Sequence, residues 1–361
     1  MSDAPRANDA PIRVLVVDDS AVVRRMVTHA LTAAPGVEVA GVAHHGQMAL
    51  DLVQRLRPDL ITMDIEMPVL DGIATVTQLR DRGVRCPIIM FSTLTAHGAA
   101  ATLDALAAGA TDYVTKPSRV ADPQQAIDAV AHSLVPKIIA LCRRPAPSRP
   151  LPLARTAVAR TRPVRAVVVG SSTGGPEALS TLLRGIPEPL PVPMLVVQHM
   201  PPVFTAHLAA RLDRHGPHRV VEASAHQRLE PGTVYIAPGD FHLEVDAPSL
   251  GQRLALHRGP QVNYCRPAVD VLFDSAVRAW GGDVVGVVLT GMGHDGRDGA
   301  KAIVDAGGTV IAQDRDTSVV WGIPGAVVNA GLAHQVLPID RVGPAVAAAV
   351  SASLRPHRRL P

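Results

Sequence analysis

The chain has 361 residues, about two to three times the common size of a domain, so two domains are the first expectation. Hydrophobic residues make up 47% and charged residues 19%, an ordinary globular balance that excludes a largely disordered or fibrous chain. Only 2% of the residues are aromatic, which predicts aliphatic cores and argues against a protein that stacks single-stranded nucleic acid. The three cysteines are widely spaced, which excludes a disulfide framework and fits a cytoplasmic protein.

The net charge of +3 does not indicate a nucleic-acid-binding face, because the basic residues concentrate in one segment. No acidic residue lies between Asp128 and Glu177, and six arginines from Arg143 to Arg162 are interspersed there with prolines. This composition predicts a semi-rigid linker over residues 133–163. No uninterrupted apolar run reaches the roughly 20 residues of a membrane helix, and Asp18 and Asp19 interrupt the first apolar run, so we expect neither membrane insertion nor a signal peptide.

Residues 12–132 alternate short aliphatic runs with helical patterns, in chain order from the N-terminus. We expect strands at residues 12–17, 37–43, 60–63, 88–91 and 112–114, and helices at residues 20–33, 46–57 and 99–108. Strands that alternate with helices predict a five-stranded parallel sheet with both faces covered. Ligands of such sheets bind at the carboxyl ends of the strands.

Residues 164–353 show a similar rhythm and predict a doubly wound, mostly parallel α/β domain. Apolar runs typical of buried parallel strands lie at residues 164–169, 194–197, 284–289 and 309–311. Between Val220 and His257 the pattern changes to short alternating runs separated by turns, which predicts antiparallel hairpins inserted in the sheet.

Three aspartates of the first block follow predicted strands. Asp18 and Asp19 follow the first strand and Asp64 follows the third, so a parallel sheet brings the three carboxylates to one edge. Two such charges about 4 Å apart repel by roughly 4 kcal/mol at an effective dielectric constant of 20. A hard divalent cation such as Mg²⁺ makes this arrangement tolerable.

The next two strands end near Ser92 and Lys116. A hydroxyl and an ammonium beside three carboxylates suit phosphoryl transfer to Asp64, with Mg²⁺ and Lys116 neutralising oxygens and Ser92 holding the phosphoryl group. The alternative is that Asp18 and Asp19 only cap a helix and that Lys116 is a solvated surface residue.

Residues 14–20 (VLVVDDS), 63–72 (MDIEMPVLDG) and 115–117 (TKP) resemble a response-regulator receiver domain. The resemblance implies a flavodoxin-like fold that is phosphorylated on Asp64 by a partner histidine kinase.

The second block contains Gly170-x-Ser172-x-Gly174 between an apolar strand and a helix that Pro176 begins. A serine on such a sharp turn is exposed at the top of a sheet, where backbone N–H groups can face an oxyanion. Ser172 holds the central position, so we prefer it to Ser171. A glycine-rich phosphate site at a helix N-terminus is the competing interpretation.

Two further strand ends favour a serine hydrolase. His199 lies just past the strand at 194–197, and Asp295 lies just past the strand at 284–289. Parallel strands would bring both to the edge that carries Ser172, as a base for the serine and a carboxylate for the base. Asp295 could instead cap the following helix, with Asp298 and Asp314 as rival members of the triad.

Residues 170–176, 198–202, 235–240, 266–273 and 289–296 resemble the chemotaxis protein-glutamate methylesterase family (CheB). The resemblance implies Ser172 as nucleophile, His199 as base and Asp295 as the orienting acid. Thr173 and Met292 match positions that line the active site, and the Thr173 N–H is the expected oxyanion donor.

The resemblance further implies a hydrolase that removes methyl groups from γ-glutamyl methyl esters on the cytoplasmic helices of chemoreceptors, in sensory adaptation. Deamidation of receptor glutamines on the same triad is an added activity in the family. Mg²⁺ serves phosphorylation, and ester hydrolysis needs no cofactor, since no metal-type spacing of His, Cys and Asp occurs in the second block. We expect the receiver to restrain the esterase until Asp64 is phosphorylated.

Two other functions compete with this interpretation. The chain could be a phosphorylation-switched interaction protein with an inert hydrolase block, but no member of the triad is missing. A DNA-binding response regulator would need a helix-turn-helix output, and the strand-rich second block offers none.

Overall fold

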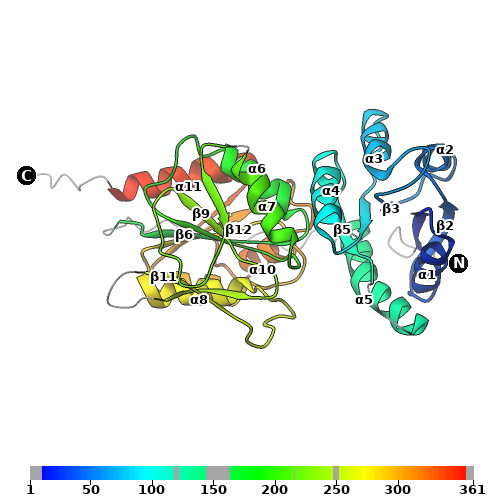
Figure 1. Ribbon diagram of the computed structural model, residues 1–361. Helices are drawn as coiled ribbons and strands as arrows, with labels where there is room; N and C mark the ends of the chain where they lie inside the picture. Colours follow the sequence, from blue (N-terminus) through cyan, green and yellow to red (C-terminus); the bar gives the residue numbers. More distant parts are fainter. Residues whose placement is uncertain (1–9, 118–121, 144–162, 215, 247–251, 355–361) are drawn as a thin grey trace, which may run out of the picture. The chain divides into compact units, whose positions relative to one another are not determined.

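The computed structural model describes residues 10–117, 122–143, 163–214, 216–246 and 252–354. The chain forms two compact units, Met1–Pro147 and Ser148–Pro361, which are described separately (Figure 1). Most of the predicted linker, residues 144–162, lies outside the described residues.

The first unit is an α/β domain around one parallel sheet. Its strand order is β2-β1-β3-β4-β5, and every neighbouring pair is parallel. The sheet contains five strands. The elements are β1 (Ile12–Val17), α1 (Ala21–Thr32), β2 (Val37–Ala43), α2 (Gly46–Leu56), β3 (Leu60–Asp64), α3 (Gly72–Asp81), β4 (Ile88–Ser92), α4 (Ala96–Ala107), β5 (Asp112–Thr115) and α5 (Pro123–Cys142). The fold class and the five predicted strands are confirmed.

Side-chain caps explain where these helices begin. The residue before each helix is extended, and its side chain accepts a hydrogen bond from a backbone N–H of the first turn. The capping residues are Ser20, His45, Asp71, Thr95 and Asp122. Because Thr95 caps α4, that helix starts three residues before the predicted position.

Helix α5 extends beyond residue 133, where the linker was predicted to begin. It continues to Cys142, so residues 133–142, which we assigned to the linker, are its last turns. Leu134 and Ile138 are buried together with Val130 in the core of the first unit, and this apolar spacing extends the helix. α5 is also the one described helix whose length and apolar composition would allow it to cross a membrane. Helices that pack on a protein core meet the same criteria, so this is weak evidence for a span.

The second unit is built on a seven-stranded sheet with the order β14-β13-β12-β6-β7-β9-β8, in which all neighbouring pairs are parallel. The strands are β6 (Ala166–Ser171), β7 (Met194–Gln198), β8 (Arg219–Glu222), β9 (Thr233–Ile236), β12 (Val284–Val288), β13 (Thr309–Gln313) and β14 (Gln335–Leu337). The helices are α6 (Gly175–Arg184), α7 (Phe204–Asp213), α8 (Val269–Trp280), α9 (Arg297–Asp305), α10 (Ile323–Asn329) and α11 (Ile339–Leu354).

The segment between Val220 and His257 differs from its prediction. β8 and β9 are parallel strands of the main sheet, not a hairpin. The intervening loop returns the chain to the start of β9, and the buried Tyr235 hydroxyl fixes it by accepting from the Glu230 N–H and donating to the Arg228 carbonyl. Only β10 (His242–Asp246) and β11 (Arg253–His257) form the predicted antiparallel hairpin, as a separate two-stranded sheet.

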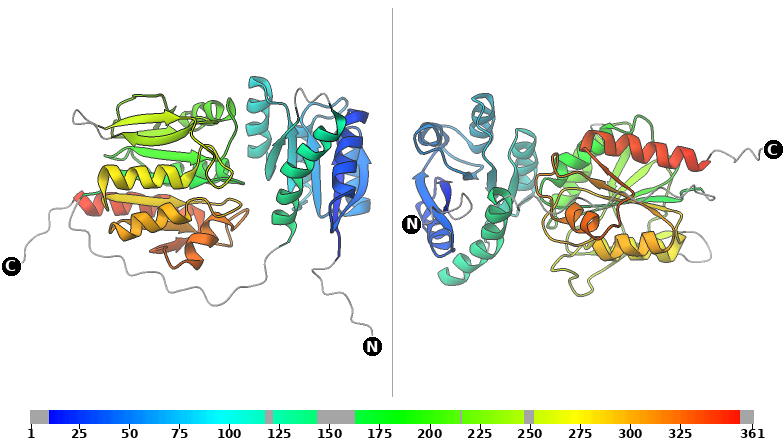
Figure 2. Two further views of the ribbon diagram at one scale, coloured as in Figure 1. Left: turned by 90° about the horizontal axis from the view of Figure 1, so that it is seen from below. Right: turned by 180° about the vertical axis from the view of Figure 1, so that it is seen from behind.

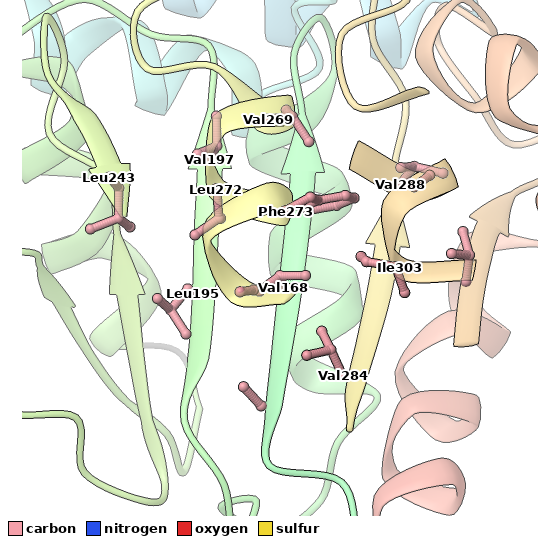
Figure 3. Packing of buried hydrophobic residues seen from close by; sticks show 14 of the residues in the cluster. Val168, Leu195, Val197, Leu243, Val269, Leu272, Phe273, Val284, Val288 and Ile303 are labelled. Carbon is pink, nitrogen blue, oxygen red and sulfur yellow. The ribbon is translucent and has the colours of Figure 1, made fainter. Parts of the chain in front are cut away.

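Helices cover both faces of the seven-stranded sheet. Figure 1 shows α6, α7 and α11 on one face and α8 on the other. Figure 2 shows this second face, where α8 packs beside α9. In Figure 3, Leu272 and Phe273 of α8 point onto the strands around Val168 and Leu195. Most residues of this core are aliphatic, with a few aromatic rings among them.

The first strand of each sheet lies at a place where the strand order reverses. In the first unit the chain leaves β1 for β2 on one side and later for β3 on the other. In the second unit β7 lies on one side of β6 and β12 on the other. Ligand sites of open α/β sheets lie at the carboxyl ends of the strands at such a reversal.

Candidate active sites at two sheet edges

Ser172 lies on the turn between β6 and α6. Its N–H donates to the Thr290 carbonyl at 3.0 Å, which ties the turn to the end of β12. Gly174 has φ 75°, a left-handed conformation, and a Cβ there would lie 2.6 Å from a methyl carbon of Val319. Only glycine fits both constraints. The turn therefore leaves Ser172 half-buried, directly before the N-terminus of a helix.

The neighbouring Ser171 has a structural role. It is fully buried, and its hydroxyl donates to Gln198 Oε1 at 2.7 Å. Gln198 in turn donates to the carbonyls of Ser172 and His199, at 2.9 and 3.1 Å. We did not single out Gln198 from the sequence, although a polar residue ending an apolar strand is a signal for it. This network favours Ser172 over Ser171 as the reactive serine.

Strand register brings Ser172 and His199 to neighbouring positions. Ser171 pairs with Gln198 across β6 and β7, and the His199 N–H donates to the Ser171 carbonyl at 3.0 Å. Ser172 and His199 therefore follow directly after a paired position, each at the carboxyl end of its strand.

His199 contacts the third predicted residue of the triad. Its Nε2 lies 2.8 Å from Asp295 Oδ2, and both side chains are largely buried. A carboxylate can only accept a hydrogen bond, so Nε2 carries the proton and Nδ1 is the basic nitrogen. The sequence analysis thus predicted that His199 and Asp295 lie close together, although they are 96 positions apart in the chain.

The Asp295 carboxylate is fixed by the N-terminus of α8. It accepts hydrogen bonds from the backbone N–H groups of Val269 and Asp270, at 2.7 and 3.1 Å. It also accepts one from the side-chain amide of Asn263, at 3.1 Å. α8 has no side-chain cap of its own, so Asp295 satisfies its first N–H groups and meets the positive end of its dipole. Asp295 does cap a helix, but not the one that follows it, whose N-cap is Gly296.

The rival aspartates have other partners. Asp298 is exposed and pairs with its neighbour Arg297 at 2.9 Å. Asp314 accepts from the backbone and hydroxyl of Thr317, at 3.0 and 2.6 Å. Neither has a described bond to His199.

The surroundings of His199 shift its pKa upward. Burial disfavours the imidazolium, but the hydrogen bond that His199 donates to Asp295, together with Cys265, outweighs burial and raises the pKa of His199 well above its usual value. The same contact lowers the pKa of Asp295 despite its burial. The pair therefore stabilises an imidazolium, as a base that takes a proton in catalysis requires.

A second side chain contacts His199. Cys265 Sγ lies 3.6 Å from His199 Nδ1. Cys265 follows a two-residue turn, in which Asn263 and Tyr264 both have positive φ and Val262 pairs with Cys265. The second block has no metal-type spacing of His, Cys and Asp in its sequence, yet the fold brings the ligand atoms of His199, Cys265 and Asp295 within 4.8 Å of one another. The three come from separate segments, so sequence spacing could not reveal them.

The loop after β12 borders Ser172. A Cβ on Gly291 would lie 2.8 Å from Ser172 Cβ, so glycine permits this close approach. The Gly291 N–H donates to Val320, while Met292 next to it is 37% exposed. Thr173 is buried, and its carbonyl accepts from the Thr290 hydroxyl at 3.0 Å.

The predicted acidic site in the first unit forms at the ends of β1 and β3. Lys116 Nζ lies 2.8 Å from Asp64 Oδ1 and 3.0 Å from Asp18 Oδ2. Asp18 and Asp64 are buried, whereas Asp19 is exposed. Ser92 is also buried, and its hydroxyl contacts the Gly98 carbonyl and the Thr102 hydroxyl at 3.1 and 2.7 Å.

These residues fit a hard divalent cation. Carboxylate oxygens of Asp18, Asp19 and Asp64 lie within 4.8 Å of one another. Asp18 Oδ2 is buried and accepts no hydrogen bond from the described residues, although the Lys116 ammonium lies nearby. Oxygen ligands of this kind suit Mg²⁺.

A cavity of about 240 Å³ opens beside these carboxylates. Glu66 and Gly98 line it in addition to Asp64, Ser92 and Lys116, and neither was predicted. Burial raises the pKa of Asp64 to about 6, against the opposing effect of Lys116 and with the added effect of Asp18. A bound cation would oppose this rise by favouring the carboxylate.

Comparisons with known proteins cover both units. The family model for CheB methylesterase matches residues 167–346, and that for the response regulator receiver domain matches residues 14–128. A Nocardioides protein named protein-glutamate methylesterase/protein-glutamine glutaminase is 56% identical over 93% of this chain and 94% of its own length. A Caulobacter vibrioides protein of the same name, numbered 2, is 47% identical over 93% and 98%.

A solved structure agrees with the second unit. The Thermotoga maritima CheB methylesterase catalytic domain is 44% identical, with a TM-score of 0.50, and the match covers 51% of this chain and 97% of that one. On these matches, the chain belongs to the CheB methylesterase family, with an N-terminal response regulator receiver domain.

Proposed function

We propose that this protein is a phosphorylation-activated protein-glutamate methylesterase that uses Ser172, His199 and Asp295 as its catalytic triad. One observation carries the proposal. His199 follows the strand next to the Ser172 turn and forms a largely buried pair with Asp295, and the N-terminus of α8 anchors the Asp295 carboxylate. The names of the relatives support the reaction and its substrate class.

The reaction begins when Ser172 Oγ attacks the carbonyl of a γ-glutamyl methyl ester. His199 Nδ1 takes the serine proton, and Asp295 stabilises the imidazolium through Nε2. The C–O bond to methanol breaks as His199 returns the proton to the leaving oxygen. Water, activated by the same imidazole, then hydrolyses the acyl-enzyme and restores the glutamate and the serine.

The turn and the neighbouring loop supply charge stabilisation. In a turn of this kind the residue after the nucleophile provides an N–H to the oxyanion, and here that residue is Thr173. Because the Gly291 N–H is bonded to Val320, the second donor comes from Met292 or Gly293. Deamidation of a glutamine would follow the same steps with ammonia as the leaving group, as the relatives' second name suggests.

We further infer that the substrate esters lie on cytoplasmic helices of a chemoreceptor and that a chemotaxis histidine kinase supplies the phosphoryl group. Asp64 attacks the phosphohistidine, so its P–N bond breaks as an O–P bond to Asp64 forms. Asp18, Asp19 and Asp64 would hold Mg²⁺, which supplies charge neutralisation when bound. Lys116 and the Ser92 hydroxyl would contact the phosphoryl oxygens.

Phosphorylation would then shift an equilibrium between a restrained and an active form. A phosphoryl group adds about −1.5 to −2 charges beside Lys116, by analogy with other phosphorylated side chains. It can shift the equilibrium only as far as its affinities for the two forms differ. A complete switch from 1% to 99% active would need about 5.5 kcal/mol, so we expect partial activation above a basal rate.

The decisive experiment measures methanol release from methylated receptor by the wild type and by Ser172→Ala. We expect the variant to lose activity by a factor on the order of 10⁴ or more, while its folding is unchanged by circular dichroism. A Ser172→Ala variant that still releases methanol at a rate near the wild type would contradict the proposed nucleophile.

A further inference from the structure

Cys265 has no part in the proposed hydrolysis, yet its thiol contacts the catalytic base. Sγ lies 3.6 Å from His199 Nδ1, the nitrogen that must accept the serine proton. Cys265 is half-buried, and its turn is held by hydrogen bonds in both directions between Val262 and Cys265, at 3.1 and 2.9 Å. The thiol is therefore fixed beside the reactive nitrogen.

The separation of the two atoms matches that of two ligands on one zinc ion. A Zn–S distance of about 2.3 Å, a Zn–N distance of about 2.0–2.1 Å and a tetrahedral angle together give an S···N separation of about 3.6 Å. The observed distance is 3.6 Å. Sulfur and imidazole nitrogen are also the ligand types that zinc prefers.

The far side of the imidazole already has the contact that zinc-binding histidines make. A histidine on zinc donates its other ring N–H to a carboxylate, which fixes the tautomer and ring orientation. Here Nε2 lies 2.8 Å from Asp295 Oδ2, and Asp295 is itself held by the Val269 and Asp270 N–H groups. Nδ1 and Sγ are therefore presented together to one side of the ring.

We propose that His199 Nδ1 and Cys265 Sγ form an inhibitory site for a thiophilic divalent cation, with Zn²⁺ as the ion of choice. Binding places the Nδ1 lone pair on the metal and releases the thiol proton to solvent, with water completing the coordination. The lone pair is then unavailable to Ser172, so hydrolysis stops without any redox change. The inhibition rests on His199 being the base, whereas the metal site itself does not.

The two candidate cation sites among the described residues differ in ligand chemistry. The receiver cluster of Asp18, Asp19 and Asp64 offers only carboxylate oxygens, which suit Mg²⁺, while the pair at His199 offers nitrogen and sulfur. An excess of Mg²⁺ should therefore occupy the first site and leave the second free for zinc. This separation allows the full-length protein to be tested.

The activity experiment titrates Zn²⁺ into the full-length protein in excess Mg²⁺, without thiols or chelator. Each variant is normalised to its own zinc-free rate. We expect zinc to inhibit the wild type and chelator to reverse the inhibition. The Zn²⁺ concentration that gives half inhibition, the midpoint, should be at least tenfold higher for Cys265→Ser. Cys86→Ser is the matched control, because Cys86 is a half-buried cysteine of the first unit, and it should keep the wild-type midpoint.

A spectroscopic experiment tests the site without relying on catalysis. Co²⁺ replaces Zn²⁺ in the full-length protein, and thiolate-to-cobalt charge-transfer absorption is recorded. The band should form in the wild type, in Cys86→Ser and in Ser172→Ala, and be absent from Cys265→Ser and His199→Ala, with folding verified by circular dichroism.

The outcomes separate the two proposals. A band that persists in Cys265→Ser, or zinc inhibition with an unchanged midpoint in that variant, overturns the metal site. A Cys265-dependent band without zinc inhibition overturns the inhibitory role. Should Ser172→Ala retain esterase activity, the proposed triad fails while the cobalt band still reports on the site.

Discussion

The two units each carry a polar site at the carboxyl edge of a parallel sheet, but they build it from different side chains. Each is a parallel sheet with helices on both faces, and each collects its polar residues where the strand order reverses. The first edge gathers Asp18, Asp64 and Lys116, and the second gathers Ser172, His199 and Asp295. The scaffold thus decides where a site lies, and the residues at the strand ends decide its chemistry.

Electrostatics distinguishes the two edges. At the first edge burial, together with the like charge of Asp18, raises the pKa of Asp64 to about 6, although the Lys116 ammonium acts to lower it. At the second edge the charges are opposite: Asp295 raises the pKa of His199, and His199 lowers that of Asp295. The first edge therefore favours a hard cation among its oxygens, whereas the second stabilises positive charge on the imidazole.

The largest effect should come from removing the base. His199→Ala should reduce methanol release by about as much as Ser172→Ala, on the order of 10⁴- to 10⁶-fold, because members of a triad act as a unit. The double variant should be no slower than either single variant. Single-turnover assays on methylated receptor measure all three, and high residual activity in His199→Ala would refute our assignment of the base.

Asp295→Asn should reduce the rate of methanol release by a smaller factor, about 10²- to 10⁴-fold, because the base remains but loses its orientation and counter-charge. Asp295 raises the pKa of His199, so a neutral amide should lower it. The base then loses its proton at lower pH, and the acidic limb of the kcat/KM profile should move to lower pH while the plateau falls. A limb that stays in place or moves to higher pH would contradict the role of Asp295.

Much of the geometry followed from strand ends read in the sequence. The first two strands of each unit end close to where the apolar runs end, and the carboxyl edges carry the residues predicted for them. This worked because parallel strands align their ends whatever lies between them. His199 and Asp295 therefore meet although 96 positions separate them.

The residues that sequence reasoning missed depend on loops. Cys265 reaches His199 through a two-residue turn with positive φ at Asn263 and Tyr264, a conformation that Asn adopts readily but Tyr rarely does. The capping of α8 by Asp295 also joins distant segments. Local patterns carry no information on such convergence, and the parallel pairing of β8 and β9 was missed for the same reason.

Phosphorylation at the first edge should have a moderate effect on the rate of hydrolysis. A small-molecule phosphodonor should raise the rate of the wild type by roughly tenfold, equivalent to about 1.4 kcal/mol. Asp64→Asn should keep the basal rate and lose this response, because the amide cannot accept the phosphoryl group. The fragment 164–353, with its fold verified, should exceed the unphosphorylated full-length rate, and a slower fragment would show that the receiver activates directly.

Chelation should affect phosphorylation at the first edge but not ester hydrolysis at the second. EDTA should block phosphorylation of the full-length protein, since the carboxylates of Asp18, Asp19 and Asp64 need a cation. Hydrolysis by the fragment 164–353 should not fall, because the proposed triad acts without a metal. Radiolabelled phosphoryl transfer and methanol release measure the two reactions. Loss of esterase activity from the fragment in EDTA would refute a metal-free triad.

The smallest effect should come from the neighbouring serine, which serves as the matched control for Ser172. Ser171→Ala removes the buried hydroxyl that donates to Gln198 Oε1 at 2.7 Å. Losing one buried hydrogen bond should lower the free energy of unfolding by about 1–2 kcal/mol, measured by urea denaturation. Gln198 keeps its two bonds to the Ser172 and His199 carbonyls, so the rate should fall by no more than a few fold. A Ser171→Ala variant as inactive as Ser172→Ala would mean that Gln198, or Ser171 itself, takes part in the chemistry.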